Sequence, residues 1–463
     1  SLAEMPVKML RQAQPLFAML PFHAVLQLGE GEFLLRFPAA CAGLLSIPIT
    51  SMLVRVLWGR RAAGLAALMA VVSPFLVRYS QEARAYAQLL VFAALSTIFL
   101  WRALSGNRRK DWVGFACALA ASLYTHYFAL FVVAVSGLFA GLVLVWQWLV
   151  AGLFERRERV RPRVCGFVLS LVLFVILYLP WVPVMRVNFF QRQMGKEAVA
   201  GGLRVTGDVI AARLGDMGVG TGWLLGGMLV LAGAGVIVTI HQRRWRALLL
   251  TLLFLLLPWT VFAMMRPRKL LSRYLIFMVP FYYGLIAAGA AGLGRWVRRW
   301  TSGGRWVGGA VAAIAVCALF VIPGVVRLGD LYAERKMDLR GVAWFLEQNV
   351  PPGQPISAPA YDLYLDLYQP SLNDHFVYSR TEEAVREAYA VYPRIWFVDG
   401  WAHRVNIDPD GSLTAWFDRL PAVVIHFYDI DVLYVGRDVP LAELRAETEG
   451  LVLPEGVTIS YRE

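Results

Sequence analysis

Residues Ser73–Tyr86 read SPFLVRYSQEARAY and lie between two long apolar runs. The polar and charged side chains of Arg78, Gln81, Glu82 and Arg84 follow directly after the first run. Ionisable groups near bilayer depth are costly, so those that occur there reach water, pair with one another or bind a charged ligand. The stretch is therefore either a solvated turn with a Glu82–Arg84 ion pair or part of a site for a charged ligand.

The composition is that of a polytopic membrane protein. Of 463 residues, 58% are hydrophobic and only 17% are charged, whereas soluble domains carry about 25% charged residues. The apolar stretches recur at the length of about 20 residues that crosses about 30 Å of hydrocarbon. We expect a mainly α fold, a membrane helical bundle with about ten spans. Two of them are Ala62–Tyr79 and Trp112–Tyr124.

Charge is divided unevenly along the chain. Residues 330–463 contain 22 acidic and 11 basic side chains, and residues 1–329 contain 10 acidic and 34 basic ones. The basic residues fall in alternate short loops such as Gly59–Arg61 and Arg295–Arg299, which is the pattern of cytoplasmic loops in multi-pass membrane proteins. We therefore expect a multi-pass protein of the inner (plasma) membrane with an extracytoplasmic, periplasmic tail and no nucleic-acid partner.

These patterns predict three regions. Residues 1–32 form an outer-face juxtamembrane segment, residues 33–329 the transmembrane domain, and residues 330–463 a small soluble α/β domain. Within the first region, Ala13–Leu28 is short and contains Pro15 and Pro21, which favours a helix lying along the outer interface. The alternative is a true span, which would invert every later loop and contradict the charge pattern.

The tail has the local signals of a water-soluble domain. Helical spacing runs over Asp338–Gln348 and stops before Pro351, and Thr381 followed by two acids is typical of a helix start. Arg394–Asp399 and Asp431–Val435 are apolar runs typical of buried strands. Strands that alternate with helices predict a small α/β layer.

Two groups of cations stand at helix ends that the charge pattern places outside the cell. Arg84 precedes one apolar run, and Arg266, Arg268, Lys269 and Arg273 precede another. Outer loops are normally poor in Lys and Arg, and guanidinium groups suit phosphate oxygens. This excess favours an anionic ligand at the outer leaflet, such as a lipid phosphate. The alternative is simple anchoring to lipid headgroups.

Two further polar side chains are candidates. The turn Tyr124–Tyr127 contains His126, which either donates to a substrate oxygen or is a satisfied histidine in the interfacial belt. Arg36 either snorkels to the interface or pairs with neighbouring acids. The six histidines and four cysteines have no metal-binding spacing. No cofactor is indicated, and a divalent metal stays an open alternative.

These motifs together resemble the GT-C membrane glycosyltransferases, in particular the bacterial branch of the protein O-mannosyltransferase and aminoarabinose-transferase superfamily. The residues that carry the resemblance are Gln14–Leu16, Gly29–Pro38, Ser73–Tyr86, Tyr124–His126 and Arg273-Tyr274. The Ser-Gln-Glu-Ala-Arg block within Ser73–Tyr86 is the most specific of them. The similarity covers most of residues 1–326 and is weaker in the tail.

The resemblance implies a GT-C fold and a reaction. In that family an outer cavity binds a polyprenyl-phosphate sugar, and the sugar passes with inversion to an extracytoplasmic acceptor, which is a glycan, lipid or protein. The residues so assigned to the donor phosphate are Arg84, Arg266, Lys269, Arg273 and Tyr274. Those assigned to the substrate cavity are Gln14, Arg36, Gln81, Glu82, Tyr86 and His126.

The sequence departs from the family pattern at the catalytic carboxylate. The family's Asp-Glu pair follows a first helix and aligns upstream of Ser1, and Glu4 does not match its position. We expect the chain that begins at Ser1 to be cut at its N-terminus, and to bind the donor without transferring the sugar. Loss of a positioned base commonly lowers a rate by about 10²–10⁴-fold.

Two other functions draw on the same residues. A non-enzymatic binder or flippase of polyprenyl-phosphate lipids needs the outer cations but no base. A secondary transporter typically has internal repeats and broken helices near the membrane midplane. The sequence has no internal repeat, and its charged residues gather at helix ends rather than in mid-span, which favours the glycosyltransferase.

Overall fold

The computed structural model describes residues 15–29, 32–153, 158, 160–186, 203–267, 270–300, 305–333, 337–359, 361–377, 379, 381–400, 404, 407–408 and 411–463. The chain divides into two units, Ser1–Leu331 and Tyr332–Glu463. We call the first the membrane unit and the second the C-terminal unit, and each is described by itself.

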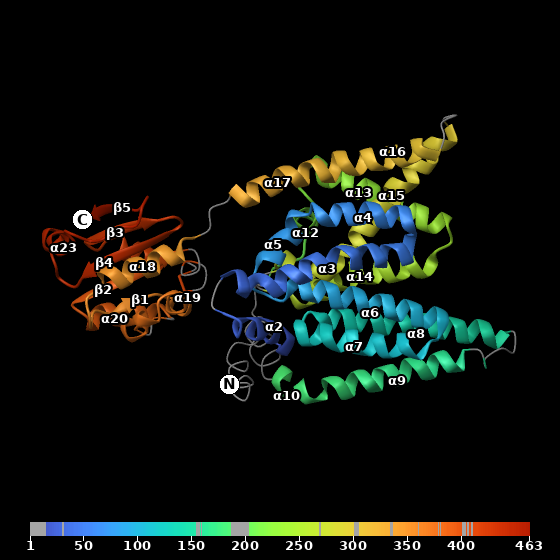
Figure 1. Cartoon of the computed structure of the whole chain (residues 1–463), viewed down its shortest axis with the longest axis horizontal. Helices are drawn as coiled ribbons and strands as arrows, with labels where there is room; N and C mark the ends of the chain where they lie inside the picture. The colour runs from blue at the N-terminus through green and yellow to red at the C-terminus, as the bar shows by residue number, and fades with distance from the viewer. Residues whose placement is uncertain are drawn as a thin grey trace. The chain divides into compact units, whose positions relative to one another are not determined.

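The membrane unit consists of helices, many of them long and running side by side (Figure 1). Its first half comprises α2 Leu16–Leu26, α3 Glu32–Trp58, α4 Arg60–Val71, α5 Pro74–Gln81, α6 Tyr86–Gly106, α7 Arg109–Thr125, α8 Ala129–Leu153, α9 Arg161–Tyr178, η2 Leu179–Trp181 and α10 Val182–Met185. Its second half comprises α12 Gly207–Met217, α13 Trp223–His241, α14 Trp245–Met265, η4 Ser272–Met278, α15 Val279–Trp300, α16 Arg305–Val316, the π-helix η5 Cys317–Val321 and α17 Ile322–Ala333.

The predicted mainly α membrane bundle is confirmed, with fewer spanning helices than the ten expected. Among the described residues, eight helices are long and apolar enough to cross a membrane, or nine if α4 and α5 form one span. The predicted span Ala62–Tyr79 is this pair, bent by 55°, because Pro74 lacks the N–H that would continue α4. The predicted span Trp112–Tyr124 lies in α7, whose 17 residues reach only about 25 Å.

Helix α15 forms the centre of the membrane unit. The most apolar part of the span that it forms with η4 is wholly buried, and α15 packs against α13, α16 and α4. A side chain at Gly289 would overlap the backbone carbonyl of Leu231 on α13, and one at Gly294 would overlap that of Gly308 on α16. Small residues let helix backbones approach closely where apolar solvation gives no driving force.

Short turns bring distant parts of the sequence to one end of the bundle. Helices α6, α7 and α8 pack against one another, so the start of α6 lies near the turn between α7 and α8 (Figure 1). The 3₁₀ segment η4, at the start of the α15 span, packs against α6 and α12. Tyr86, His126 and Arg273 are thereby gathered at the same end.

The C-terminal unit is a five-stranded sheet of order β1-β2-β4-β3-β5. The strands are β1 Ile356–Ser357, β2 Arg394–Gly400, β3 Ala422–Phe427, β4 Ile430–Gly436 and β5 Thr458–Arg462. Alternate side chains of the strands build a core on each face. Helices α18 Leu339–Asn349, α19 Asp362–Tyr368 and α23 Leu441–Glu447, with η6 Pro370–His375, contribute to one core, and α20 Glu382–Val391 and α22 Ser412–Phe417 to the other.

The local signals read in the tail are confirmed. Asp338 caps α18 by accepting a hydrogen bond from the N–H of Gly341, and Thr381 caps α20 by accepting one from the N–H of Ala384. The two predicted strands are contained in β2 and β4. Strands β1, β3 and β5 were not predicted, and the sheet is antiparallel apart from the β1–β2 pair.

Candidate functional site

Aromatic rings and one arginine, from four elements, meet at one end of the membrane unit. We call this set the Arg273 cluster; its members are Tyr79 on α5, Tyr86 on α6, His126 and Phe128 in the α7–α8 turn, and Arg273 and Tyr274 on η4. The first half of the chain supplies four of these side chains, and η4, at the start of the α15 span, supplies two. The cluster therefore depends on the tertiary packing of η4 against α6.

Arg273 is the central cation of the cluster. Its guanidinium carbon lies 5.6 Å from the ring centroid of Tyr86 and 5.8 Å from that of Tyr274, within the range of cation–π attraction. Its Nε is buried and makes no hydrogen bond among the described residues. A buried N–H without an acceptor costs free energy, so Arg273 offers a positioned donor to an anion.

The rings form a continuous wall around this cation. The centroids of Tyr79 and Tyr86 lie 5.5 Å apart, and Tyr86 lies 5.5 Å from His126. His126 stacks on Phe128 at 5.3 Å, and Phe128 stacks on Tyr274 at 4.6 Å. Contacts of this kind fix ring orientation, so the wall is a preformed surface.

His126 is a neutral donor at the edge of this wall. It follows the last residue of α7, and its Nδ1 accepts a hydrogen bond of 3.2 Å from the backbone N–H of Phe128. Burial, together with the positive charges of Arg273 and Arg84, lowers the pKa of His126 to about 4. At neutral pH the ring therefore carries its proton on Nε2, which can donate to an oxygen.

A carboxylate from α12 holds the segment that carries Arg273. The hydroxyl of Ser272 donates to Oδ2 of Asp216 at 2.5 Å, and Nη1 of Arg213 lies 3.0 Å from the same oxygen. Since Ser272 immediately precedes Arg273, this bond fixes the start of η4. No local sequence pattern indicates this contact, because Asp216 and Ser272 are 56 positions apart.

The conspicuous Ser-Pro pair at the start of α5 has a structural role. Ser73 caps α5 by accepting from the N–H of Leu76, and its hydroxyl lies 2.7 Å from the hydroxyl of Tyr283. The Tyr283 hydroxyl donates to the carbonyl of Met217 at the end of α12. This buried chain of bonds ties α5, α12 and α15 together, and thereby positions both sides of the Arg273 cluster.

The other predicted site residues have varied positions. Arg84 is exposed just before α6 and acts electrostatically on His126. Gln81 and Glu82 are half-buried at the end of α5, and Arg36 is half-buried on α3. Arg266 is exposed at the end of α14 and makes none of the ring contacts that the described residues form around Arg273. Gln14, Arg268 and Lys269 lie outside the described residues.

Sequence reasoning missed Tyr79, Phe128, Asp216 and Ser272. Tyr79 lies inside the SPFLVRYSQEARAY stretch, one helical turn after Phe75, and this helical spacing of aromatic residues is the sequence signal for it. The other three are recognisable only from tertiary contacts. Among the described residues, no three His, Cys, Asp or Glu side chains are placed to hold a metal ion.

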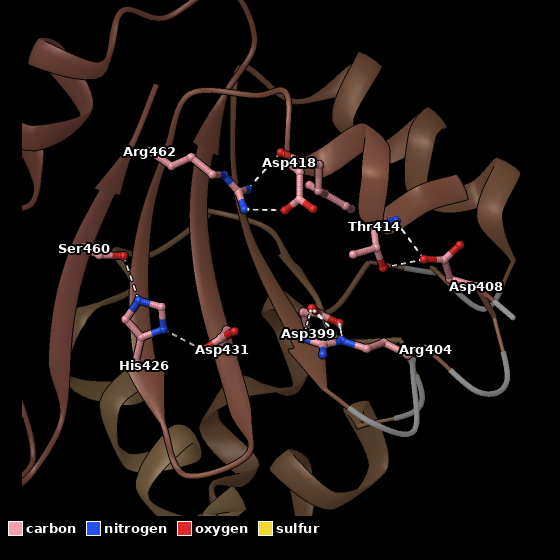
Figure 2. Close-up of polar contacts among 10 residues, drawn as sticks. Asp399, Arg404, Asp408, Thr414, Asp418, His426, Asp431, Ser460 and Arg462 are labelled. Carbon is pink, nitrogen blue, oxygen red and sulfur yellow. Dashed lines mark hydrogen bonds and ion pairs between the residues drawn. The ribbon is translucent and has the colours of Figure 1, made fainter. Parts of the chain in front are cut away.

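The C-terminal unit carries a second polar cluster, on one end of its sheet (Figure 2). Nδ1 of His426 on β3 lies 2.8 Å from Oδ1 of Asp431 on β4, and its Nε2 lies 2.7 Å from the hydroxyl of Ser460 on β5. Asp399 on β2 pairs with Arg404 at 2.8 Å. These groups satisfy one another, and the side chains of His426 and Asp431 are 42% and 31% exposed. They stabilise the strand pairing rather than aim free groups at a ligand.

A cavity of about 500 Å³ also opens in the C-terminal unit, at the end of α18. Its polar lining includes Glu347, Gln348, Ser371 and His375. The hydroxyl of Ser371 donates to Glu347 at 2.8 Å, and Nδ1 of His375 lies 2.9 Å from the carbonyl of Gln354. The size is within the range of small-molecule sites.

Comparison with known proteins agrees with the architecture. Residues 13–182 match the family described as dolichyl-phosphate-mannose-protein mannosyltransferase. The chain superposes on ArnT from Cupriavidus metallidurans in the apo state with a TM-score of 0.55 and 15% sequence identity, over 91% of this chain and 87% of that one. The chain has the GT-C fold. No curated protein sequence matches the chain significantly.

Two further structures share this GT-C fold. ArnT from Cupriavidus metallidurans bound to undecaprenyl phosphate gives a TM-score of 0.53 at 16% identity, over 98% of this chain and 94% of that one. The archaeal oligosaccharyltransferase AglB from Archaeoglobus fulgidus, in complex with an inhibitory peptide and a dolichol-phosphate, gives 0.50 at 12% identity, over 89% and 64%. The segment matched by the family, residues 13–182, includes Arg84, Tyr86 and His126.

Proposed function

We propose that the protein is a membrane glycosyltransferase that moves a sugar from a polyprenyl phosphate to an extracytoplasmic acceptor. The observation that carries this proposal is the buried Nε of Arg273, which has no hydrogen-bond partner among the described residues and lies inside a wall of aromatic rings. An oxygen of the lipid phosphate would accept from this Nε–H, and the rings of Tyr86 and Tyr274 would flank the guanidinium.

The cluster suits the leaving group of the transfer. As the bond between the anomeric carbon and the phosphate oxygen breaks, negative charge grows on the phosphate. Arg273 and Arg84 would stabilise that charge electrostatically, and Nε2–H of His126 would add a neutral hydrogen bond. A neutral histidine is preferable here, because a third cation among two arginines would be costly in the absence of the phosphate.

The acceptor supplies the other half of the reaction. Its hydroxyl oxygen would attack the anomeric carbon on the face opposite the phosphate, which inverts the configuration, while its proton passes to a carboxylate. Of the carboxylates described near the cluster, Asp216 is committed to Ser272 and Arg213. Glu82 interacts electrostatically with Tyr79, and it is the first to test as a base.

The orientation in the membrane belongs to the same proposal. The turns rich in arginine would face the cytoplasm, and the Arg273 cluster and the C-terminal unit would face outward. A single cysteine at the exposed Glu455 should react with an impermeant thiol reagent in intact cells, in a variant that lacks the four native cysteines. A cysteine at Arg109 should stay protected until the cells are opened, and the reverse result would invert the topology.

The activity can be tested without knowing the acceptor. Purified protein in lipid nanodiscs, extended upstream of Ser1 by the helix and Asp-Glu pair that the family resemblance implies, is mixed with an envelope extract and a panel of polyprenyl-phosphate sugars, and the release of polyprenyl phosphate is measured. One sugar donor of the panel should be consumed by the wild type and at least about tenfold more slowly by Arg273→Gln. A protein that binds the lipids but consumes no donor would be a lipid binder or flippase, the second function that the cluster is compatible with.

A further inference from the structure

A second group of arginines meets at the opposite end of the membrane unit. Arg61 follows the α3–α4 turn, Arg244 lies in the α13–α14 turn, and Arg295, Arg298 and Arg299 lie in the last turns of α15. We call these five residues the basic end cluster. Arg295 interacts electrostatically with each of the other four, although the five come from three separate parts of the sequence.

Hydrogen bonds and close helix packing hold these turns together. Nη1 of Arg244 donates to the carbonyl of Leu57 at 2.7 Å, and Nε1 of Trp58 donates to the hydroxyl of Thr239 at 2.8 Å. Both bonds join the end of α3 to the α13–α14 region. The close approach of α15 to α16 at Gly294 fixes the backbone just before Arg295. The arginines are thus brought together by the packing of the helices and not by acidic partners.

The basic end cluster lacks a counter-charge within the described parts of the chain, unlike several other arginines. Among the described residues, none of its five members has an ion pair with an acidic side chain. By contrast, Arg102 pairs with Asp111, Arg394 with Glu443 and Glu447, and Arg462 with Asp418. Five like charges at half-buried and exposed positions repel one another, so an anion bound among them would relieve the repulsion.

Tryptophans indicate the depth at which that anion lies. Trp245, Trp296 and Trp300 flank the same turns, and they are 56%, 56% and 77% exposed. Exposed tryptophans at the ends of apolar helices sit at the level of the lipid headgroups. The partner of the cluster is therefore a headgroup in the leaflet, rather than a solute in the surrounding water.

The number of guanidinium groups indicates the kind of headgroup. One guanidinium can donate two parallel hydrogen bonds to one phosphate, so a single phosphate is saturated before five arginines are used. We propose that the basic end cluster binds the headgroup of a phospholipid that carries two phosphates. Basic pockets between membrane helices are known to hold such headgroups.

This site is distinct from the proposed donor site. Arg273 stands at the start of the α15 span and the basic end cluster at its finish, separated by the length of α15, whose 22 residues measure about 33 Å. The inference does not depend on glycosyl transfer, and a protein of any function with this end surface would bind the lipid.

The test compares lipids and variants in purified protein. Wild-type protein is placed in phosphatidylcholine nanodiscs with cardiolipin, which carries two phosphates, or with twice the amount of phosphatidylglycerol, which gives the same total charge. Thermal unfolding is followed, and bound lipid is counted by native mass spectrometry. Cardiolipin should raise the unfolding temperature more than phosphatidylglycerol does, and about one molecule should stay bound.

The variant Arg295→Gln/Arg299→Gln should weaken retention of cardiolipin about tenfold. The matched control is Arg108→Gln/Arg109→Gln, which removes two exposed arginines from the α6–α7 turn and should retain the lipid. Equal effects of the two lipids on the wild type would reduce the cluster to a general membrane anchor. Equal losses in the two double variants would overturn the site, and the wild-type comparison decides the matter even if one variant fails to fold.

Discussion

Replacing Arg273 by Gln should remove the main determinant of phosphate binding while leaving the membrane unit folded. The guanidinium makes no ion pair among the described residues, and its contacts are the faces of Tyr86 and Tyr274. A glutamine fits in the space of the arginine stem and keeps an N–H donor. It loses the positive charge and the buried Nε–H, which has no partner within the described parts of the chain.

The magnitude follows from the kind of bond that is lost. A hydrogen bond to a charged group is worth about 1.5–3 kcal/mol, which corresponds to a dissociation constant weaker by about 10- to 150-fold. Arg273→Lys keeps the charge and loses the planar fork, so its loss should be intermediate. Arg266 is exposed at the end of α14, and Arg266→Gln should cost no more than about 1 kcal/mol, as for other surface charges.

The assay measures equilibrium binding of undecaprenyl phosphate, and of the uncharged alcohol undecaprenol, to the protein in nanodiscs. The phosphate should bind far more tightly than the alcohol to the wild type, and the difference should nearly vanish in Arg273→Gln. Two results would refute the reasoning. One is unchanged phosphate binding by Arg273→Gln, and the other is an equal loss in Arg266→Gln, which would make both residues general lipid anchors.

Asp216 should act through the segment that it holds rather than by touching the lipid. Asp216→Asn weakens the bond to Ser272, so we expect undecaprenyl phosphate to bind about fivefold more weakly, from about 1 kcal/mol of lost hydrogen bonding. Asp208→Asn changes an exposed acid on the same helix and serves as the control. If both variants bind like the wild type, Asp216 does not position Arg273.

Three predictions concern stability, each measured as thermal or chemical unfolding of the full chain. The pKa of His126 is about 4 in the folded chain and about 6.5 in the unfolded chain, so between these pH values the unfolded chain binds more protons, and the free energy of unfolding should fall as the pH drops from about 6.5 to about 4. His126→Gln should make the free energy of unfolding depend less on pH in this range. An unchanged pH dependence would assign it to other groups. Gly289→Ala should cost about 1–3 kcal/mol because its Cβ meets the Leu231 carbonyl, while Gly309→Ala, with open space around it, should not destabilise. The hydrogen bond from Arg394 lowers the pKa of Glu447, so the ion pair contributes to the free energy of unfolding above about pH 4.5, and this contribution is lost as the pH falls through the folded pKa. The destabilisation caused by Arg394→Leu should therefore be smaller in acid. A destabilisation that does not change with pH would mean that the pair contributes packing alone.

The fold was predictable where local chemistry determines it. Apolar length and the alternation of arginine-rich loops predicted a bundle of membrane helices, and the caps Asp338 and Thr381 marked two helix starts correctly. The predicted span Trp112–Tyr124 lies in α7, whose 17 residues are at the lower limit of the length that crosses a bilayer. The bend at Ser73 could have been predicted from Pro74, because a proline cannot continue the preceding helix.

The failure to predict β5 in the C-terminal unit has a different cause. Strand β5, Thr458–Arg462, is half exposed to exposed along its length and pairs only with β3, so it lacks the continuous apolar run of a central strand. The antiparallel order could not be read from alternation of helices and strands, which equally suits parallel sheets.

The candidate site was predictable only as a set of residues. Arg84, Tyr86, His126 and Arg273 were named from motifs, but their convergence depends on the packing of η4 against α6. The bond between Asp216 and Ser272 closes a loop of 56 positions, and no local pattern signals such a pair. The neutral state of His126 also needed the structure, because it results from burial beside two cations.

The most direct test of the central claim is a single-turnover measurement with the sugar donor identified from the panel. The proposal predicts that one polyprenyl phosphate is released for each sugar that appears on the acceptor, and that the new glycosidic bond has the opposite anomeric configuration to the donor. It also predicts that Arg273→Gln slows both events together. Donor that stays bound and intact in the presence of acceptor, or a sugar transferred with retained configuration, would contradict the account.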